Sequence, residues 1–321
     1  MSGMKSAGTI VMPGGAGFLG RHLAAYFSAQ GYSVVVLSRQ PGADSGKIRS
    51  MHWDGRTLGP WEKALEGARA VINLAGRTVN CRYTAKHRAE IYDSRLESTA
   101  VIGRAIAASS NPPPVWLNAA SATIYRDADD RPMDESTGEL GTGFSVDVCQ
   151  KWEAALDAAS TPATRKVALR SAMVFGAGDG GVFEAFRRVV ALGLGGTLGR
   201  GSQFVSWIHV RDFCRAVQFI TDDDVPDPLR GPVNLASPHP VTNREFMRIF
   251  RRACHKRIGL PASRWMLEIG AFFLRTETEL LLKSRQVIPG KLLARGFGFE
   301  FPDLGPALED VVRADKEGRA A

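Results

Sequence analysis

The feature that most constrains the fold is a glycine-rich turn between an apolar run and an amphipathic segment near the N-terminus. The run Thr9–Met12 leads into Gly14-Gly15-Ala16-Gly17-Phe18-Leu19-Gly20, and a helical pattern follows over Phe18–Gln30. A strand, a tight glycine turn and a helix in immediate succession are typical of the first unit of a doubly wound parallel sheet. We therefore expect the rest of the chain to continue as alternating strands and helices.

The glycine spacing predicts that the turn binds a dinucleotide. Gly15, Gly17 and Gly20 match G-x-G-x-x-G. Gly14, Gly17 and Gly20 also match the spacing G-x-x-G-x-x-G. One glycine permits the turn, one lets the backbone approach a pyrophosphate, and the last allows close packing of helix on strand. The helix N-terminus offers unpaired N–H groups to phosphates. The alternative is a purely structural turn. The expected contact residues are Gly14, Gly17, Phe18, Leu19 and Gly20.

The end of the second strand indicates which dinucleotide is bound. The run Val34–Leu37 is followed by Ser38 and Arg39, and the next acidic residue is Asp44. An NAD site usually has Asp or Glu here to bind the ribose 2′-hydroxyl. Arg39 can instead pair with a 2′-phosphate, and Ser38 can add a hydroxyl donor. We therefore predict NADP(H), the alternative being a solvated arginine at a strand end.

A third cofactor contact is expected after the apolar run Ala70–Leu74. Leu74, Ala75 and Gly76 end that run in small residues, where a sheet edge can receive the adenosine half of the cofactor. Gly76 could alternatively be only a hinge. Together with the two earlier features, this favours a cofactor role for all three residues.

The remaining pattern predicts an α/β fold, a Rossmann doubly wound parallel sheet with a smaller C-terminal substrate lobe. Short apolar runs alternate with helical patterns, as expected for parallel strands covered on both faces. We place a cofactor-binding core at residues 1–175 and a mixed lobe with a helical extension at 176–321, with one strand returning to the core sheet. The further expected strands are Val115–Ala120, Lys166–Leu169 and Pro232–Ala236, and the further helices are Ala85–Ser109, Val146–Ala159 and one or two amphipathic helices over Trp265–Leu282.

Composition narrows the partners. The 321 residues carry a net charge of +8, but basic residues are scattered among 33 acidic ones, which favours a small anionic molecule over nucleic acid. The apolar stretch Trp265–Leu282 contains charged residues, so we expect no membrane span. Four widely spaced cysteines without a signal pattern predict reduced thiols in a cytoplasmic protein. No histidine pair has metal-ligand spacing, so we expect no metal.

Motifs along nearly the whole chain resemble one family. These motifs are GGAGFLG (14–20), LSRQP (37–41), NLAG (73–76), DSRLEST (93–99), SATIY (121–125), CQKWE (149–153), LRSAMVFG (169–176), SWIHVRD (206–212) and KLLARGFGFEFPDL (291–304). In order and spacing the chain resembles the extended short-chain dehydrogenase/reductase superfamily, within the NAD-dependent epimerase/dehydratase group. More narrowly, it is similar to an atypical subfamily with a C-terminal extension of unknown function. The resemblance implies a Rossmann core, NADP(H) binding and a substrate pocket formed with the C-terminal lobe.

The same resemblance implies a catalytic serine, tyrosine and lysine, the last two spaced Y-x-x-x-K on one helix. Ser121 and Lys151 match the serine and the lysine, and Lys151 would also hold the nicotinamide ribose. Asp147 stands where the tyrosine is expected, and none of the five tyrosines has a lysine four residues later. An aspartate normally ionises near pH 3.9, so it would need burial to hold a proton at neutral pH. Cys149 and Tyr125 are alternative proton carriers, which leaves the donor unassigned.

Other residues of the quoted motifs are candidates for binding the substrate. Trp207 and His209 would share one face of a strand and could line a pocket, while Arg95 and Arg170 could hold an anionic substrate. His209 could instead be a satisfied structural histidine, and Arg95 could be an ordinary residue of a helix surface. Asp212 could cap the helix that follows it.

Two functions remain open from the sequence. The first is an NADP(H)-dependent oxidoreductase or epimerase-like enzyme acting on a small carbonyl or hydroxyl compound, which could be anionic. The second is a non-catalytic NADP(H)-binding redox sensor or regulatory protein, suggested by the missing tyrosine. A homodimer formed through a helix pair is common in the superfamily and is also compatible with this chain.

Overall fold

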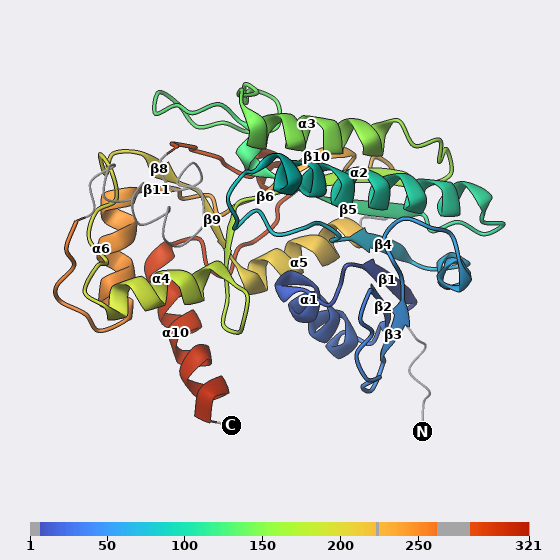
Figure 1. Ribbon diagram of the computed structural model, residues 1–321, viewed down its shortest axis with the longest axis horizontal. Helices are drawn as coiled ribbons and strands as arrows, with labels where there is room; N and C mark the ends of the chain where they lie inside the picture. Colours follow the sequence, from blue (N-terminus) through green and yellow to red (C-terminus); the bar gives the residue numbers. More distant parts are fainter. Residues whose placement is uncertain (1–6, 223–224, 262–282, 321) are drawn as a thin grey trace.

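The central sheet forms from the apolar runs of the first two thirds of the chain and one later strand (Figure 1). The structure is a computed structural model that describes residues 7–222, 225–261 and 283–320. Seven strands make the sheet, namely β1 (Thr9–Pro13), β2 (Ser33–Ser38), β3 (Ile48–His52), β4 (Ala70–Asn73), β5 (Val115–Ser121), β6 (Arg165–Ser171) and β10 (Gly231–Leu235).

The strand order is β10-β6-β5-β4-β1-β2-β3, and every neighbouring pair is parallel. The chain moves outward in one direction from β1 to β3 and in the other from β4 to β10. The order therefore reverses between β1 and β4, and such a reversal opens a crevice beyond the carboxyl ends of the two strands. This confirms the predicted doubly wound Rossmann sheet.

Helices cover both faces of the sheet. On one face lie α1 (Phe18–Ala29) and α5 (Val210–Thr221), and on the other α2 (Ala85–Ala108) and α3 (Phe144–Asp157) (Figure 1). Alternate residues of each strand supply the two apolar layers: Ile10 and Met12 of β1 pack beneath α1, and Val11 packs toward α2. Covering on both faces explains why the strands are apolar throughout instead of alternating.

The sequence did not reveal β3, which lies at the outer edge of the sheet and pairs only with β2. Its residues Ile48–His52 are half-exposed or exposed, so the strand needs no apolar run. Two short 3-10 helices were also unexpected: η1 (Pro60–Leu65) before β4, and η2 (Ala122–Ile124) directly after β5.

A smaller lobe packs against one end of the sheet (Figure 1). Its core is a cluster of phenylalanines: Phe175, Phe183, Phe186, Phe246 and Phe250. Among the described residues, the elements that follow β6, apart from α5 and β10, are β7 (Met173–Phe175), α4 (Val182–Ala191), β8 (Phe204–Val205), β9 (Trp207–His209), β11 (Val241–Thr242), α6 (Asn243–Ala253), α9 (Gly290–Ala294) and α10 (Leu304–Ala320). The chain after residue 175 also contributes to the core, since β10 is a strand of the central sheet and α5 covers one of its faces. The division at residue 175/176 stays a prediction. The expected helices over Trp265–Leu282 lie outside the described residues.

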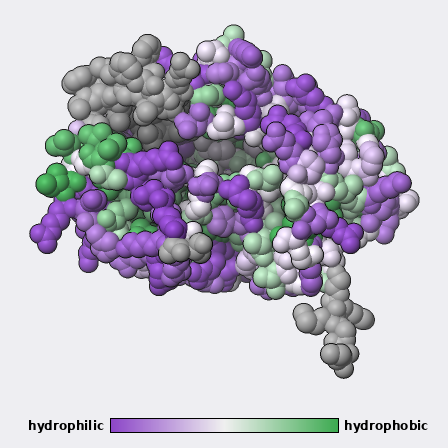
Figure 2. All heavy atoms as spheres, turned by 60° about the horizontal axis from the view of Figure 1, so that its bottom comes forward, coloured by the Kyte–Doolittle hydropathy of each residue, from purple (hydrophilic) through white to green (hydrophobic). Residues whose placement is uncertain are grey.

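The face in Figure 2 is mostly hydrophilic, with its strongest apolar colour on the side where Figure 1 shows α4 and α6. Four exposed apolar side chains belong to that part of the chain: Leu192, Leu194, Ile258 and Leu260. Among the described residues no helix is both long and apolar enough to cross a membrane.

Candidate cofactor and catalytic site

Three glycines of the β1–α1 turn are required by the packing of the protein itself, and a Cβ on one of them, Gly15, would come within 2.8 Å of the Met12 carbonyl oxygen. Gly14 has φ +74°, and a Cβ there would come within 2.6 Å of the Ala75 backbone nitrogen. A Cβ on Gly20 would lie 2.2 Å from the carbonyl oxygen of Gly15. Gly14 thus permits the turn and the contact with the loop after β4, whereas Gly20 permits helix α1 to pack on the turn.

Gly17 differs from these three glycines. Its φ is −74°, which any residue adopts, and a Cβ there would meet only the Gly14 oxygen, at 3.8 Å. Gly17 is exposed and begins α1 without a side-chain cap, and the first turn of the helix contains no acidic residue. The protein therefore leaves open space and uncapped N–H groups where a pyrophosphate would approach the backbone. The residues present fit the dinucleotide predicted from the sequence.

The end of β2 lies directly beside this turn, because the Gly14 N–H donates to the Leu37 carbonyl at 2.9 Å. Ser38 closes a local turn: its hydroxyl donates to the Gln40 carbonyl at 3.1 Å and accepts from the Gln40 N–H at 3.2 Å. Arg39 is exposed and has no hydrogen-bond or ion-pair partner in the described part of the chain. Of the two residues predicted to bind a 2′-phosphate, Arg39 is the one whose donors are not used by other described residues.

The loop after β4 completes the crevice. The Leu74 N–H donates to the Pro13 carbonyl at 2.8 Å, which joins this loop to the glycine turn. Ala75 is held by the Asn73 side chain, whose oxygen accepts its N–H at 3.0 Å. Gly76 is exposed. The structure thus brings Leu74, Ala75 and Gly76 beside the glycine turn, while their contacts with a cofactor stay a prediction.

Arg95 of α2 contacts the loop that follows β4. Its guanidinium donates to the carbonyls of Arg77 at 3.2 Å and Ile91 at 3.1 Å and stacks 4.9 Å from the centre of the Trp152 ring. A Cβ on Gly76 would lie 3.3 Å from the Arg95 Cζ. These contacts assign Arg95 to positioning the backbone of the loop, and they do not support the expectation that it holds an anionic substrate.

Phe18 and the first turn of α1 meet the glycine-rich loop 176–181. A Cβ on Gly181 would approach the Phe18 ring to 2.8 Å, so the loop packs closely over this side chain. Arg21 donates to the Asp179 carbonyl at 2.7 Å, and a His22 ring nitrogen lies 3.0 Å from the Ala177 carbonyl oxygen. Leu19 packs against the main core. The chain that leads into the smaller lobe is thereby fixed beside the predicted cofactor crevice.

The predicted catalytic residues lie on adjacent elements. Ser121 is the last residue of β5, and its hydroxyl donates to Thr123 Oγ1 at 2.9 Å and accepts from the Thr123 N–H at 3.2 Å, which caps η2. The turn η2 packs against α3, the helix that carries Lys151. Thr123 therefore places a second hydroxyl group beside Ser121, and the sequence analysis did not predict this residue at the site.

The position of the missing tyrosine is occupied by an ionised aspartate. Lys151 Nζ pairs with Asp147 Oδ2 at 2.8 Å, one helical turn away, and the Tyr92 hydroxyl from α2 donates to the same oxygen. The Lys151 ammonium and the Tyr92 hydroxyl hold the pKa of Asp147 below its usual range. Asp147 therefore cannot supply a proton at neutral pH. Burial, followed by the hydrogen bond to Asp147, raises the pKa of Tyr92 to about 12.

Tyr92 was missed because it approaches from another helix, 55 residues before Asp147 in the chain. A weak signal existed, since Tyr92 precedes Arg95 by three residues and shares its face of the helix.

Neither alternative proton carrier from the sequence faces an open site. Burial raises the pKa of the Cys149 thiol to about 12, which makes it a packing residue. Tyr125 is fully buried; its hydroxyl donates to Asn234 Oδ1 at 2.9 Å and accepts from Arg170 at 2.9 Å. Arg170 in turn forms a bidentate pair with Glu153, at 2.8 and 2.7 Å. Because that pair neutralises it, Arg170 does not fit the predicted role of holding an anionic substrate.

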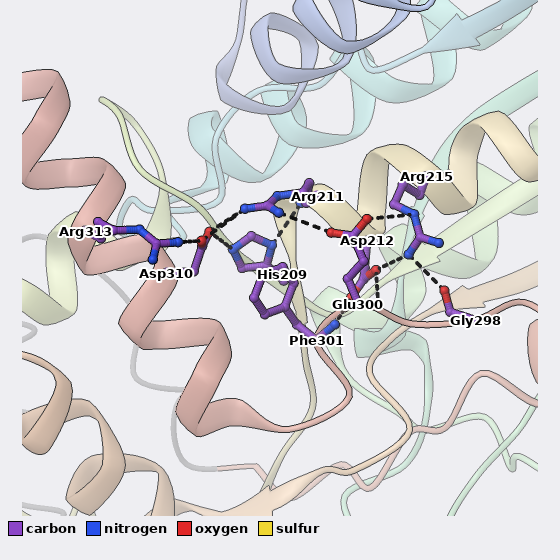
Figure 3. A network of polar contacts seen from close by, with 9 residues as sticks. All are labelled: His209, Arg211, Asp212, Arg215, Gly298, Glu300, Phe301, Asp310 and Arg313. Atoms are coloured by element: carbon purple, nitrogen blue, oxygen red, sulfur yellow. Dashed lines mark hydrogen bonds and ion pairs between the residues drawn. The ribbon is translucent and has the colours of Figure 1, made fainter.

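His209 is a structural residue, contrary to the expectation that it lines a pocket with Trp207 (Figure 3). Its Nδ1 accepts the Arg211 N–H at 3.1 Å and so caps α5, and its ring lies 4.0 Å from the Phe301 ring. Burial lowers its pKa to about 4. Trp207 is fully buried, and its Nε1 donates to the His239 carbonyl at 3.1 Å.

Asp212 is not the predicted helix cap. It is fully buried within the first turn of α5, and its oxygens accept the N–H groups of Glu300 at 2.9 Å and Phe301 at 2.8 Å (Figure 3). Close by, Arg211 pairs with Asp310 of α10 at 3.0 Å. These contacts fasten the C-terminal segment to the start of α5.

The comparisons with known proteins agree with this architecture. The model of the NAD dependent epimerase/dehydratase family matches residues 10–236, and that of a domain of unknown function (DUF1731) matches residues 262–311. The chain is 32% identical over 309 residues to the bovine epimerase family protein SDR39U1, covering 94% of this chain and 99% of that protein. Against the Mycobacterium tuberculosis epimerase family protein MT2273 it is 32% identical over 303 residues, covering 93% and 96%.

Among solved structures, human epimerase family protein SDR39U1 (isoform 2) with NADPH aligns with a TM-score of 0.84 at 30% identity, covering 95% of this chain and 99% of that one. MoeE5 in complex with UDP-glucuronic acid and NAD aligns with a TM-score of 0.77 at 19% identity, covering 97% and 100%, which shows a shared fold alone. From the matched residues, the parallel sheet and the glycine turn, the chain belongs to the NAD-dependent epimerase/dehydratase family and carries its C-terminal DUF1731 region.

Proposed function

We propose that this chain binds NADP(H) across the carboxyl ends of β1, β2 and β4 and uses it as an oxidoreductase or epimerase on a small carbonyl or hydroxyl compound. The observation that carries the proposal is Gly17, the glycine of the turn that the protein's own packing does not require. Its open space next to an uncapped helix N-terminus suits a pyrophosphate. The human relative crystallised with NADPH supports the same cofactor class.

The preference for NADP(H) over NAD(H) depends on Arg39. Its exposed guanidinium follows β2, whose end hydrogen-bonds to the glycine turn, and it has no partner among the described residues. A charged hydrogen bond to a phosphate contributes about 1.5–3 kcal/mol, which corresponds to roughly a 10- to 100-fold preference.

Within the bound complex, Ser121 and Lys151 take separate roles. NADPH supplies the hydride for a reduction, and the protein positions the reacting oxygen. Ser121, at the carboxyl end of β5, would orient that oxygen through its hydroxyl. Lys151 uses one ammonium donor on Asp147, so further donors remain for the ribose hydroxyls of the cofactor.

Titrations with NADPH and NADH test the cofactor assignment. Wild-type protein should bind NADPH more tightly than NADH, and Arg39→Ala should remove most of that difference, by about 10- to 100-fold in the ratio of the Kd values. Gln40→Ala, a neighbouring change without loss of charge, serves as the matched control. An unchanged ratio in Arg39→Ala would overturn the NADP(H) assignment.

Turnover is tested by following NADPH absorbance with a panel of small aldehydes, ketones and nucleotide sugars. Activity that disappears in Ser121→Ala and Lys151→Ala supports the enzyme. Activity that survives both changes places the chemistry elsewhere.

A second candidate is a non-catalytic NADP(H)-binding protein that responds to redox state. The observation in its favour is that an ionised aspartate, Asp147, stands where the catalytic tyrosine of the family is expected. Tight NADPH binding together with no turnover across the panel would favour this candidate.

A further inference from the structure

The proposed enzyme needs a group that transfers a proton, and the proposed function assigns no proton donor. One cluster of titratable side chains could supply it. Tyr92, Asp147 and Lys151 meet where helices α2 and α3 face each other. Asp147 and Lys151 lie on α3, and Tyr92 lies on the neighbouring helix α2. Helix α3 also packs against η2, the turn that Ser121 caps. The turn that Ser121 caps and the cluster therefore contact the same helix, α3.

Three contacts fix how α2 and α3 are aligned. Tyr92, Arg95 and Thr99 follow each other at i, i+3 and i+7, so they lie on one face of α2. Tyr92 donates to Asp147, Arg95 stacks on Trp152, and Thr99 Oγ1 accepts from Trp152 Nε1 at 3.1 Å. The position of the Tyr92 hydroxyl is consequently set by the whole helix pair.

The Tyr92 side chain is apolar along its ring and polar at its tip. The ring packs edge-on against Phe144 at 5.5 Å, and Lys151 Nζ lies 4.9 Å from its centre. The charged groups that face it are Asp147 and Lys151 from α3 and Arg88 from its own helix. Tyr92 is half-buried, while Asp147 and Lys151 have side-chain exposures of 43% and 56%, so the cluster is open to a ligand and to solvent.

We propose that Tyr92 is the catalytic tyrosine of this chain, delivered from α2 instead of α3, and that Asp147 is the positioning residue that holds its hydroxyl beside Lys151. This inference rests on the proposed enzymatic function. In a reduction, the Tyr92 hydroxyl turns its proton from Asp147 toward the substrate. The Tyr92 O–H bond then breaks as an O–H bond forms on the substrate oxygen, while the carbonyl carbon receives the hydride that NADPH supplies. The cofactor is oxidised to NADP⁺, and Tyr92 regains a proton from solvent at the exposed Lys151 side.

The arrangement favours one direction of proton transfer. In a Y-x-x-x-K pair the lysine stabilises the phenolate, whereas here a carboxylate stands between lysine and phenol. Burial and Asp147 keep the Tyr92 phenol protonated well above neutral pH. A protonated phenol can give a proton to the alkoxide that develops on a carbonyl, but it is a poor base for the reverse step. Carbonyl reduction is thus the expected direction.

The location of Tyr92 can be tested without any substrate. Protein labelled with 3-fluorotyrosine gives one fluorine NMR signal for each of its five tyrosines, and the Tyr92 signal is the one missing from Tyr92→Phe. The signal is titrated against pH with NADP⁺ or NADPH bound. The positive charge of oxidised nicotinamide beside the phenol should lower its pKa by at least about one unit relative to NADPH.

Tyr26 is the internal reference for this titration, because it lies on α1 at the other face of the sheet and donates to Gln218. Its signal should titrate identically with either form of the cofactor. If the Tyr92 signal also titrates identically, Tyr92 does not face the reacting end of the cofactor and the proposal is wrong.

Turnover supplies the second test. Tyr92→Phe should lower kcat by at least about 100-fold while changing the Kd for NADPH by less than about twofold, and Tyr26→Phe should leave both unchanged. The double variant Tyr92→Phe/Asp147→Tyr rebuilds Y-x-x-x-K with Lys151 and should recover activity over Tyr92→Phe alone.

The outcomes separate this inference from the proposed function. If wild-type protein turns over a substrate and Tyr92→Phe does so equally well, the enzyme stands and Tyr92 is not its proton donor. If wild-type protein binds NADPH and turns over nothing in the panel, the enzymatic function fails, and the fluorine titration still decides whether Tyr92 faces the nicotinamide.

Discussion

The glycine turn and the α2–α3 face lie at the same edge of one sheet, yet they are built in opposite ways. The turn is a contiguous segment, Gly14–Gly20, whose geometry follows from glycines that contact each other and the ends of β2 and β4. The α2–α3 face, where Tyr92 of α2 meets Asp147 of α3, joins residues that are 55 positions apart. The proposed role of each of these two residues depends on its contact with the other.

The difference shows which constraints belong to the backbone and which to side chains. In the turn, backbone atoms approach so closely that only glycine fits, as at Gly20. On the α2–α3 face, side chains meet across a helix pair, so several residue types could occupy each position without a clash. Substitutions in the turn are therefore expected to damage folding or cofactor binding, and those between the helices to change alignment and chemistry.

The largest expected effect tests the packing role of Gly20. In Gly20→Ala the new Cβ would lie 2.2 Å from the Gly15 oxygen, so the backbone of the turn must move. We expect a loss of about 3 kcal/mol or more in the free energy of unfolding, measured with urea. Stability equal to wild type would show that the turn is not held by this contact.

Gly17→Ala is the matched partner within the same turn. Its Cβ meets only one atom, at 3.8 Å, so the free energy of unfolding should stay within about 1 kcal/mol of wild type. The affinity for NADPH should nevertheless fall by about tenfold or more, because the methyl group occupies the approach of the pyrophosphate. If both variants lose the same stability and the same affinity, the two glycines do not have separate roles.

For helix α3, the Arg170–Glu153 pair tests whether a buried ion pair holds the helix against β6. The two side chains are 8% and 14% exposed, and Arg170→Leu leaves Glu153 without its partner. We expect a loss of about 3 kcal/mol in the free energy of unfolding. Most of it should return in Arg170→Leu/Glu153→Leu, which removes both charges.

A role in binding an anionic substrate would give a different result. Arg170→Leu would then raise the KM for that substrate and leave the stability close to wild type. The two measurements on one variant therefore separate the structural assignment of Arg170 from the one expected from its sequence position.

The same contrast explains what the sequence could predict. The doubly wound sheet, six of its strands and the helices on both faces follow from local patterns, since apolar runs and glycine turns act on neighbouring residues. The edge strand β3 was missed because Ile48–His52 is largely exposed and needs no apolar run. The spacing assigned close helix packing to the last glycine, Gly20, but left open whether Gly14 or Gly15 permits the turn, and the structure gives the positive φ to Gly14.

The side-chain assignments at the site were the least predictable. His209 and Arg170 have the residue types of a polar pocket, and only the fold shows that one caps α5 and the other pairs with Glu153. Tyr92 could not be found from spacing to Lys151, because its partner lies on a different helix. Contacts between distant segments depend on how helices pack, which a single sequence does not display.

The smallest expected effect concerns whether the α2–α3 face acts as one unit. Thr99→Val keeps the shape of the side chain but removes the acceptor of the Trp152 Nε1–H at 3.1 Å, which should cost about 1–2 kcal/mol of unfolding free energy. Thr99→Ser keeps the hydroxyl and is the control.

If the three contacts align the helices together, Thr99→Val and Tyr92→Phe are coupled, and the double variant should depart from additivity by about 0.5 kcal/mol or more. Strict additivity would mean that Tyr92 is placed by its own contacts with Phe144 and Asp147, independently of the helix alignment at Thr99.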